Sequence, residues 1–365
     1  MKTYTLIILN AVLLYSCNSQ EYARNYLTAY ENNDSVEIRR HFDSINFYFG
    51  SIANSNDLHN YEFINSFNSI TLENGHKWGS LLKNGEVGNY DFSAADSIVN
   101  EALKNNCRVR GHTLIWGSLS DRFKSPDLEE YLKRFPENER KQVLYNLIKH
   151  HIDTVLVHFK GRVMEWDVVN EPLGMMRGKD YDKTIFYRYF GEDYVPMCFK
   201  LAHQADPTIR LFLNEQLHNY TETKAYKLLD LINELKANDI PIQGVGLQSH
   251  VMFSVPEIAD VKKYLDTLAL LGLDIELTEV DARLRLFRKE ADPYEAQARF
   301  YMQLLNICIE NKKCKGFTFW GYSDKDVWYD RHMSWMFRKP NEPYLFDAEM
   351  NPKPLYFLIS NTFSK

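Results

Sequence analysis

Two glutamates that each follow an apolar, strand-like run are the residues of this chain best suited to chemistry. Glu171 lies in the run WDVVNEP at 166–172, and Glu279 lies in IELTEVD at 275–281. Carboxyl groups held at the ends of parallel strands suit the hydrolysis of a sugar acetal, because one group can protonate the leaving oxygen while the other attacks or guides water. This pair is the best indication of function in the sequence.

Eight short β-rich runs alternate with helical segments and could position these carboxyl groups. The runs are 47–53, 67–72, 108–113, 164–170, 210–214, 244–248, 274–278 and 316–320. Between them the spacing of apolar residues is helical, as in 228–235, and Ser93 is expected to cap a helix over 94–105. Eight β-then-α units favour an α/β fold with a single (β/α)8 barrel (TIM barrel) over an open doubly wound sheet. No run is followed by a nucleotide-binding glycine pattern.

Polar and aromatic residues follow most of these runs. In a (β/α)8 barrel this is the end where functional side chains gather. Any one of them could be a solvated loop residue or a core tryptophan, but a whole set at the same end of consecutive strands favours a site. The set is Glu73, Asn74, Lys77, His112, Trp116, Asn170, Glu171, Gln248, His250, Glu279 and Trp320.

Composition and charge narrow the class of ligand. The net charge is -6 without a long basic block, which argues against nucleic acid and against a polyanionic ligand. The 23 Tyr, 22 Phe and 6 Trp residues include possible platforms for the apolar faces of sugar rings, although core packing accounts for most of them. No zinc or calcium spacing is present, so we expect no metal and no cofactor.

The N-terminus reads as a targeting segment. Lys2 precedes an apolar run over 6–14, and Ser16 and Cys17 follow, as in a bacterial lipoprotein signal peptide. We expect residues 1–17 to be this signal with Cys17 lipidated, 18–46 to be a tether or barrel-leading segment, and 47–365 to be the catalytic barrel. The alternative is an ordinary cleaved secretory signal. A transmembrane helix is disfavoured, because the apolar run is too short to span a membrane. Either reading predicts export, with the protein anchored at the cell surface or in the periplasm, or secreted.

The other four cysteines fall into two groups. Cys308 and Cys314 flank a short polar turn and could form a disulfide in an exported protein, or remain buried thiols. Cys107 and Cys198 have no local partner and are expected to be core residues.

Taken together, the chain resembles the family 10 glycoside hydrolases, the (β/α)8 endo-β-1,4-xylanases of clan A. The resemblance runs from about Phe47 to Tyr356. Besides the two glutamate motifs, it rests on the segments FNSIT (67–71), GHTLIW (111–116), GVGLQSH (244–250), FTFWG (317–321), Asp324-Lys325 and PKP (352–354).

The resemblance implies a role for each catalytic residue. Glu171 would be the acid/base and Glu279 the nucleophile of a retaining enzyme, with the carboxyl groups about 5 to 5.5 Å apart. Asn170 would donate to the sugar 2-hydroxyl. His250 would bind the nucleophile, with Asp281 behind it holding the imidazole.

The resemblance also implies a substrate, xylan or a xylo-oligosaccharide, and a binding cleft. On the non-reducing (glycone) side four polar residues would bind sugar hydroxyls, and three tryptophans would wall the cleft, with Trp335 an alternative to Trp328. The expected binding set is Glu73, Asn74, Lys77, His112, Trp116, Gln248, Trp320 and Trp328. We expect a monomer that contacts a membrane only through its N-terminal lipid.

Three positions depart from the family pattern. Gly117 and Leu119 stand where histidine and glutamine are usual, and Gln216 stands where tyrosine often follows the strand-five pair. Each lost hydrogen bond to a sugar costs about 0.5–1.5 kcal/mol. We therefore hypothesise an altered glycone subsite, opened to decorated xylan. The alternatives are a hydrolase of another β-1,4-linked glycan and a non-catalytic glycan-binding lipoprotein. The long segment 324–345 could cap the aglycone (reducing-end) side or be a solvated loop.

Overall fold

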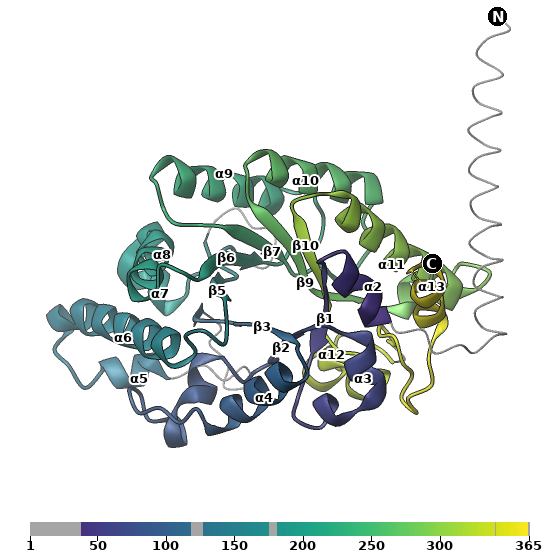
Figure 1. Cartoon of the computed structure of the whole chain (residues 1–365). Coiled ribbons are helices and arrows are strands. Elements are labelled where there is room, and N and C mark those ends of the chain that lie inside the picture. Colours follow the sequence, from purple (N-terminus) through teal and green to yellow (C-terminus); the bar gives the residue numbers. More distant parts are fainter. Residues whose placement is uncertain (1–37, 118–126, 175–180, 340, 364–365) are drawn as a thin grey trace, which may run out of the picture.

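Strands of a parallel sheet curl into a closed barrel with helices around the outside (Figure 1). The computed structural model describes residues 38–117, 127–174, 181–339 and 341–363. Along the sheet the order is β3-β2-β1-β10-β9-β7-β6-β5-β4, with β8 beside β9. The strands are β1 (Tyr48–Ile52), β2 (Ser69–Thr71), β3 (Arg108–Arg110), β4 (Ile115–Trp116), β5 (Glu165–Asn170), β6 (Arg210–Glu215), β7 (Gly244–Leu247), β8 (His250–Val251), β9 (Asp274–Ala282) and β10 (Cys314–Phe319).

The third barrel strand closes the ring in two pieces. Its first half, β3, pairs with β2, and its second half, β4, pairs with β5. Between them Gly111 bridges to Trp166, where a side chain on residue 111 would collide with the indole. Each of the eight β-rich runs predicted from the sequence contains a strand, and the predicted (β/α)8 barrel is confirmed.

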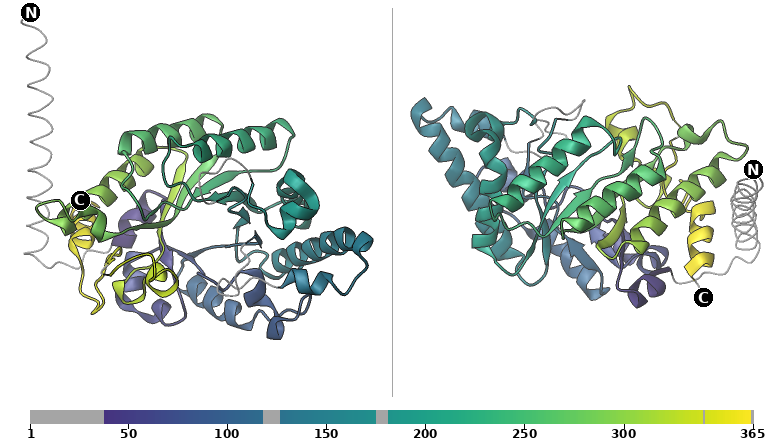
Figure 2. Two further views of the ribbon diagram at one scale, coloured as in Figure 1. Left: turned by 180° about the vertical axis from the view of Figure 1, so that it is seen from behind. Right: turned by 90° about the horizontal axis from the view of Figure 1, so that it is seen from above.

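Helices cover the outside of the barrel, as the views in Figure 2 show. The face of α9 predicted from residues 228–235 is buried. The helix over 94–105 is also present as α4, but Ser93 is its first residue rather than its cap, and the Asp91 carboxylate accepts the Ser93 N–H. The helices are α2 (Ile38–Ser44), α3 (Tyr61–Ser66), α4 (Ser93–Lys104), α5 (Leu128–Leu132), α6 (Glu137–His158), α7 (Ile185–Phe190), α8 (Tyr194–Ala205), α9 (Thr223–Ala237), α10 (Ile258–Leu270), α11 (Pro293–Glu310), α12 (Trp328–His332) and α13 (Pro354–Phe363).

The N-terminal segments predicted from the sequence are only partly described. The expected signal peptide, including Cys17, and residues 18–37 lie outside the described residues. Residues 38–44 form α2, whose buried Phe42 stacks on Phe49 of β1. The described end of the 18–46 segment therefore leads into the barrel. No described helix has the length and apolar character needed to cross a membrane.

The four cysteines in the described part of the chain form one disulfide and two buried thiols. Cys308 near the end of α11 and Cys314 at the start of β10 form a disulfide with a Cα–Cα distance of 5.2 Å. Cys107 and Cys198 are buried and unpaired. The bridge joins a covering helix to the strand that ends just before Trp320.

The inside of the barrel is ionic. The Arg110 guanidinium donates to Asp167 at 2.6 Å and lies 3.0 Å from Glu276. Arg108 also reaches Glu276, at 2.7 Å. Because β3 and β9 are not neighbours in the sheet, these ion pairs cross the interior of the barrel. Burial alone would raise the pKa of Glu276, but the charges of the two arginines lower it.

Removal of Arg110 should destabilise the fold, because buried carboxylates would lose their counter-charge. We predict that Arg110→Met lowers the free energy of unfolding by about 3–5 kcal/mol in urea denaturation. Lys149→Gln, which breaks an exposed ion pair with Asp153 on α6, is the control and should cost less than about 1 kcal/mol. Equal losses in the two variants would contradict a structural role for this network.

Candidate active site

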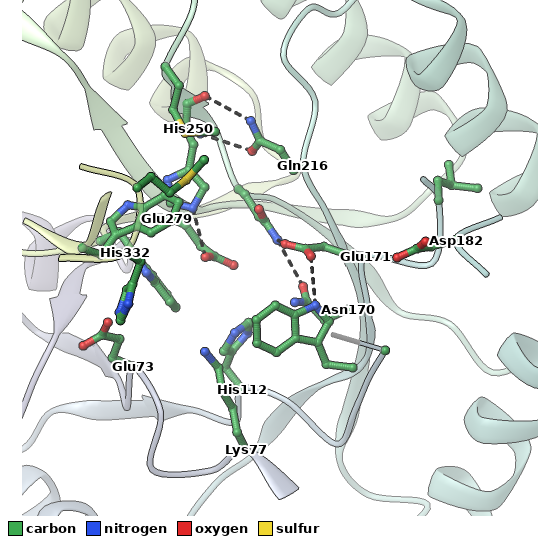
Figure 3. Close-up of a pocket in the computed structure, with 18 of the residues that line it drawn as sticks. Glu73, Lys77, His112, Asn170, Glu171, Asp182, Gln216, His250, Glu279 and His332 are labelled. Atoms are coloured by element: carbon green, nitrogen blue, oxygen red, sulfur yellow. Dashed lines mark hydrogen bonds and ion pairs between the residues drawn. The ribbon is translucent and has the colours of Figure 1, made fainter. Parts of the chain in front are cut away.

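A cleft opens at the C-terminal ends of the strands and brings together almost every residue selected from the sequence (Figure 3). Of the catalytic and binding residues predicted from the sequence, all but Asp281, which lies behind the wall, line it. The lining includes Glu73, Asn74, Lys77, His112, Trp116, Asn170, Glu171, Gln248, His250, Glu279, Trp320 and Trp328. Leu119 lies outside the described residues.

Glu279 projects from β9 and is held by two donors. His250 Nε2 lies 3.2 Å from its Oε2, and Asn214 Nδ2 donates to its Oε1 at 2.7 Å. Burial alone would raise the pKa of Glu279, but the hydrogen bond from His250, the nearby His112 and the hydrogen bond from Asn214 lower it. The carboxyl group is therefore ionised, as a nucleophile requires.

His250 carries the positive charge that keeps Glu279 ionised. Its Nδ1 lies 2.8 Å from Asp281 Oδ2, and the same oxygen accepts from Trp328 Nε1 at 2.8 Å. Burial would lower the pKa of His250, but Asp281 and then Glu279 raise it to about 10. Because this value lies above the usual 6.5, His250 stabilises the fold fully below pH 6.5, and the contribution is lost as the pH rises through about 10.

Glu171 lies at the turn that follows β5. Its backbone has φ 53°, in the left-handed region, and its N–H donates to Asn214 O at 2.9 Å. Its side chain is half-buried and accepts from Trp116 Nε1 at 2.9 Å and from Gln248 Nε2 at 2.7 Å. The carboxyl group is thus fixed in direction, while part of it remains open to the cleft.

A chain of side-chain amides joins the two glutamates. Asn170 Oδ1 accepts from Asn214 Nδ2 at 2.9 Å and from Gln248 Nε2 at 3.2 Å, while the same two donors bind Glu279 and Glu171. Because its oxygen is occupied in this way, Asn170 presents its amide N–H₂ group as the donor for a ligand.

The expected glycone residues lie together on the β2 and β3 side of the cleft. Lys77 Nζ donates to Asn74 Oδ1 at 2.9 Å and lies 4.5 Å from the centre of the Trp116 ring. His112 Nδ1 lies 2.9 Å from Asp167, which links it to the ionic barrel interior. Glu73 also reaches the cleft, but its Oε1 accepts from Arg331 of α12 at 2.7 Å.

The candidate tryptophans differ in whether their side chains reach the cleft. Trp320 and Trp328 line the cleft, and Trp328 also binds Asp281. Trp335 is 77% exposed and lies outside the cleft lining. Of the two possible matches to the family, Trp328 is therefore the one at the site. The segment 324–345 contributes His332 and Met333 to the cleft, so it is more than a solvated loop.

Sequence reasoning missed two residues that position the groups expected to be catalytic. Asn214, which binds both Glu279 and Asn170, could have been selected because it stands near the end of β6. The Gln216 side chain brackets the main chain of His250: its Nε2 donates to His250 O at 3.0 Å, and its Oε1 accepts from His250 N at 3.3 Å. In the sequence the only signal at Gln216 is its departure from the tyrosine of the family pattern.

A buried ion pair, also missed from the sequence, lies close to the segment that follows Glu171. Lys224 lines the cleft and lies 2.8 Å from Glu215, whose other oxygen accepts from Leu173 N at 3.0 Å. Burial and, more weakly, Glu171 raise the pKa of Glu215, against the lowering effect of Lys224. The pair therefore ties β6 to the segment that follows Glu171.

The space beside Gly117 is already filled. A Cβ atom on residue 117 would lie 1.9 Å from Thr184 Cγ2, so the threonine occupies the place of a larger side chain. Thr184 is also the N-cap of α7, and its neighbours Asp182 and Lys183 line the cleft. Among the described residues no group of three His, Cys, Asp or Glu side chains could hold a metal ion.

Comparisons with known proteins agree with this geometry. The family model described as glycosyl hydrolase family 10 matches residues 37–362. Endo-1,4-beta-xylanase B of Thermotoga neapolitana is 31% identical over 90% of this chain and 91% of its own length. Exoglucanase XynX of Acetivibrio thermocellus is 33% identical over 85% of this chain but only 28% of its own length. Xylanase 10B of Thermotoga petrophila, solved in complex with xylobiose, superposes with a TM-score of 0.78 at 30% identity, covering 90% of this chain and 98% of that one.

Loss of the Asp281 charge should remove the charge on His250 at neutral pH. We predict that Asp281→Asn lowers the pKa of His250 from about 10 toward 6.5, raises that of Glu279, and lowers kcat about 10- to 100-fold. Titration of the His250 ring by NMR and kcat against pH would measure both effects. Asp153→Asn on the surface of α6 is the control. An unchanged His250 titration in Asp281→Asn would rule out this account.

Proposed function

The chain belongs to glycosyl hydrolase family 10, and from this we propose that it is a retaining endo-1,4-β-xylanase. One observation carries the proposal: Glu279 is buried and held by His250 and Asn214, while Glu171 lies across the same cleft at the other end of a chain of amides. The named relatives described as xylanases support xylan as the substrate.

In the proposed first step, Glu279 attacks the anomeric carbon while Glu171 gives its proton to the leaving oxygen. The bond from carbon to that oxygen breaks, and a covalent sugar ester forms on Glu279. In the second step Glu171 takes a proton from water, which attacks the same carbon and releases Glu279. Asn170 would donate to the sugar 2-hydroxyl throughout. We expect the two carboxyl groups to lie about 5 to 5.5 Å apart in the working enzyme.

A second candidate is a hydrolase of another β-1,4-linked glycan, such as β-glucan. The one observation in its favour is the 33% identity to a protein named an exoglucanase, of which this chain spans 28%. A non-catalytic glycan-binding protein is disfavoured, because both glutamates and their supporting donors are present.

Substitution of the nucleophile tests the proposed function directly. We predict that Glu279→Ala lowers kcat/KM on xylan about 10³-fold or more, whereas Glu234→Ala on the surface of α9 leaves it unchanged. Reducing-sugar release from xylan and from β-glucan gives the substrate, and NMR of the first product should show retained configuration. Activity on β-glucan alone would overturn the xylanase proposal, and inversion would overturn the mechanism.

We also propose that the glycone subsite is altered. The glycine at position 117 supports an altered subsite, because it lacks the side chain usual in the family. The Thr184 side chain fills part of the space that the glycine leaves, so the subsite differs in shape. With Asp182 and Lys183 beside it, the subsite is reshaped by the segment that leads into α7. We propose that this shape favours a decorated sugar over an unsubstituted one.

Defined oligosaccharides test the altered subsite. We predict that the wild type has a higher kcat/KM on a branched than on a plain xylo-oligosaccharide. Gly117→Ala, which forces Thr184 to move, should lower kcat/KM about 10-fold on both and reduce the preference. Thr184→Ser keeps the capping hydroxyl but removes the methyl group that lies beside Gly117, so it should retain most activity while reducing the preference. Equal wild-type activity on plain and branched substrates would argue against the altered subsite.

A further inference from the structure

Beyond the cleft, a second cavity is lined by five cations and three apolar side chains, and we propose that it binds the carboxylate of an acidic sugar branch on the xylan chain. The inference rests on the proposed function and names a decoration that would bind away from the glycone subsite beside Gly117. This basic pocket is lined by Phe253, Arg283, Arg285, Leu286, Arg288, Lys289, Met336 and Arg338. No carboxylate is among these eight residues.

One of the five cations builds the wall of the basic pocket. Arg283 is buried, donates to Asn341 Oδ1 at 2.7 Å and to Met252 O at 3.0 Å, and lies 4.1 Å from the centre of the Phe337 ring. These contacts fix the position of its charge, whereas the other four cations are exposed.

The other four cations are exposed, and none has a carboxylate partner within the described residues. Arg285, Arg288, Lys289 and Arg338 are absent from the ion pairs that the described carboxylates form, although the whole chain carries a net charge of -6. Like charges that gather without a counter-charge repel each other, so an anion that enters between them is favoured. Arginine in particular can bind a carboxylate through two parallel hydrogen bonds.

Two segments connect the basic pocket to the cleft. Met252 lines the cleft and the next residue, Phe253, lines the basic pocket. Likewise Met333 lines the cleft, and Met336 of the same segment lines the basic pocket. The Phe253 ring also packs edge-on against His218 of the cleft, at 5.2 Å between centroids. A polymer that leaves the cleft past these residues would reach the cations.

This end of the cleft is the aglycone side. The expected glycone residues follow β2 and β3, whereas His218 follows β6 and Phe253 follows β8, on the other side of the barrel mouth. Phe253 is 52% exposed and Trp335, next to Met336, is 77% exposed. Exposed aromatic faces can stack on sugar rings, so the surroundings of the basic pocket suit a glycan that carries occasional acidic branches. A branch of this kind has a sugar body for the aromatics and a carboxylate for the arginines.

Two arginine substitutions with a charge-matched control test the proposal. The pocket variant is Arg285→Gln with Arg338→Gln. The control is Lys227→Gln with Lys263→Gln, which removes two exposed charges from α9 and α10 on the outside of the barrel. Kinetics are measured on glucuronoxylan, which carries carboxylates, and on arabinoxylan, whose branches are neutral. Both substrates are run at low and at high salt.

We expect the pocket variant to raise KM on glucuronoxylan about 10-fold with kcat retained, and to leave KM on arabinoxylan as in the wild type. The effect should shrink at high salt, because salt screens exposed charges. The control should match the wild type on both substrates. A change of equal size on both substrates, or an equal change in the control, would overturn the proposal.

Binding measurements separate this proposal from the proposed function. Calorimetry with Glu171→Gln compares a glucuronosyl xylo-oligosaccharide with the unbranched one. The proposal is supported if the glucuronosyl ligand binds more tightly than the unbranched one and this difference disappears when Arg285 and Arg338 are replaced. Because this result measures binding alone, it holds even if the wild type cleaves no xylan. Equal binding of both ligands overturns it. A third outcome is that the protein shows no preference for the acidic ligand but cosediments with phosphatidylglycerol vesicles through the same arginines. That result would overturn the proposal and assign the cations to a membrane surface.

Discussion

The positive charge on His250 is the interaction on which the active site depends. It lies between two buried carboxylates, with Asp281 on one ring nitrogen and Glu279 on the other. Asp281 raises the pKa of the imidazole to about 10, and the charged ring in turn lowers the pKa of Glu279. Other residues keep this histidine in place: Gln216 binds its main chain, and Trp328 binds the same Asp281 oxygen. The catalytic side of the cleft thus depends on the charge of this buried imidazole.

Ion pairs in the barrel interior, below the cleft, also hold residues of the site in place. Asp167 of β5 accepts from Arg110 on one side and lies 2.9 Å from His112 on the other. His112, an expected glycone residue, is therefore held by the ion pairs that cross the barrel interior. These pairs also include Glu276 of β9, the strand that carries Glu279. Fold stability and site geometry rest on shared side chains here, which is why substitution of Arg110 is expected to affect both.

Much of this arrangement could be predicted from the sequence. Short buried runs separated by amphipathic helices specify the barrel, and the C-terminal ends of parallel strands meet at one mouth, so Glu171 and Glu279 were expected there. The ionic interior was not predicted, because Arg110 and Glu276 meet only when the sheet closes. Asn214 and Gln216 were missed for a similar reason, since their partners lie on other strands. At Gly117 the sequence showed a lost side chain, but only packing showed that Thr184 takes its place.

The ion pair between Glu73 and Arg331 couples the glycone end of the cleft to its surroundings. It joins the turn after β2 to α12, two segments 258 positions apart in the chain, and both side chains are partly exposed to solvent. Dissolved ions weaken such a contact far more than they weaken the buried pairs around His250. Ionic strength therefore sets how strongly α12 is held against the turn after β2, while the buried groups around His250 keep their charge.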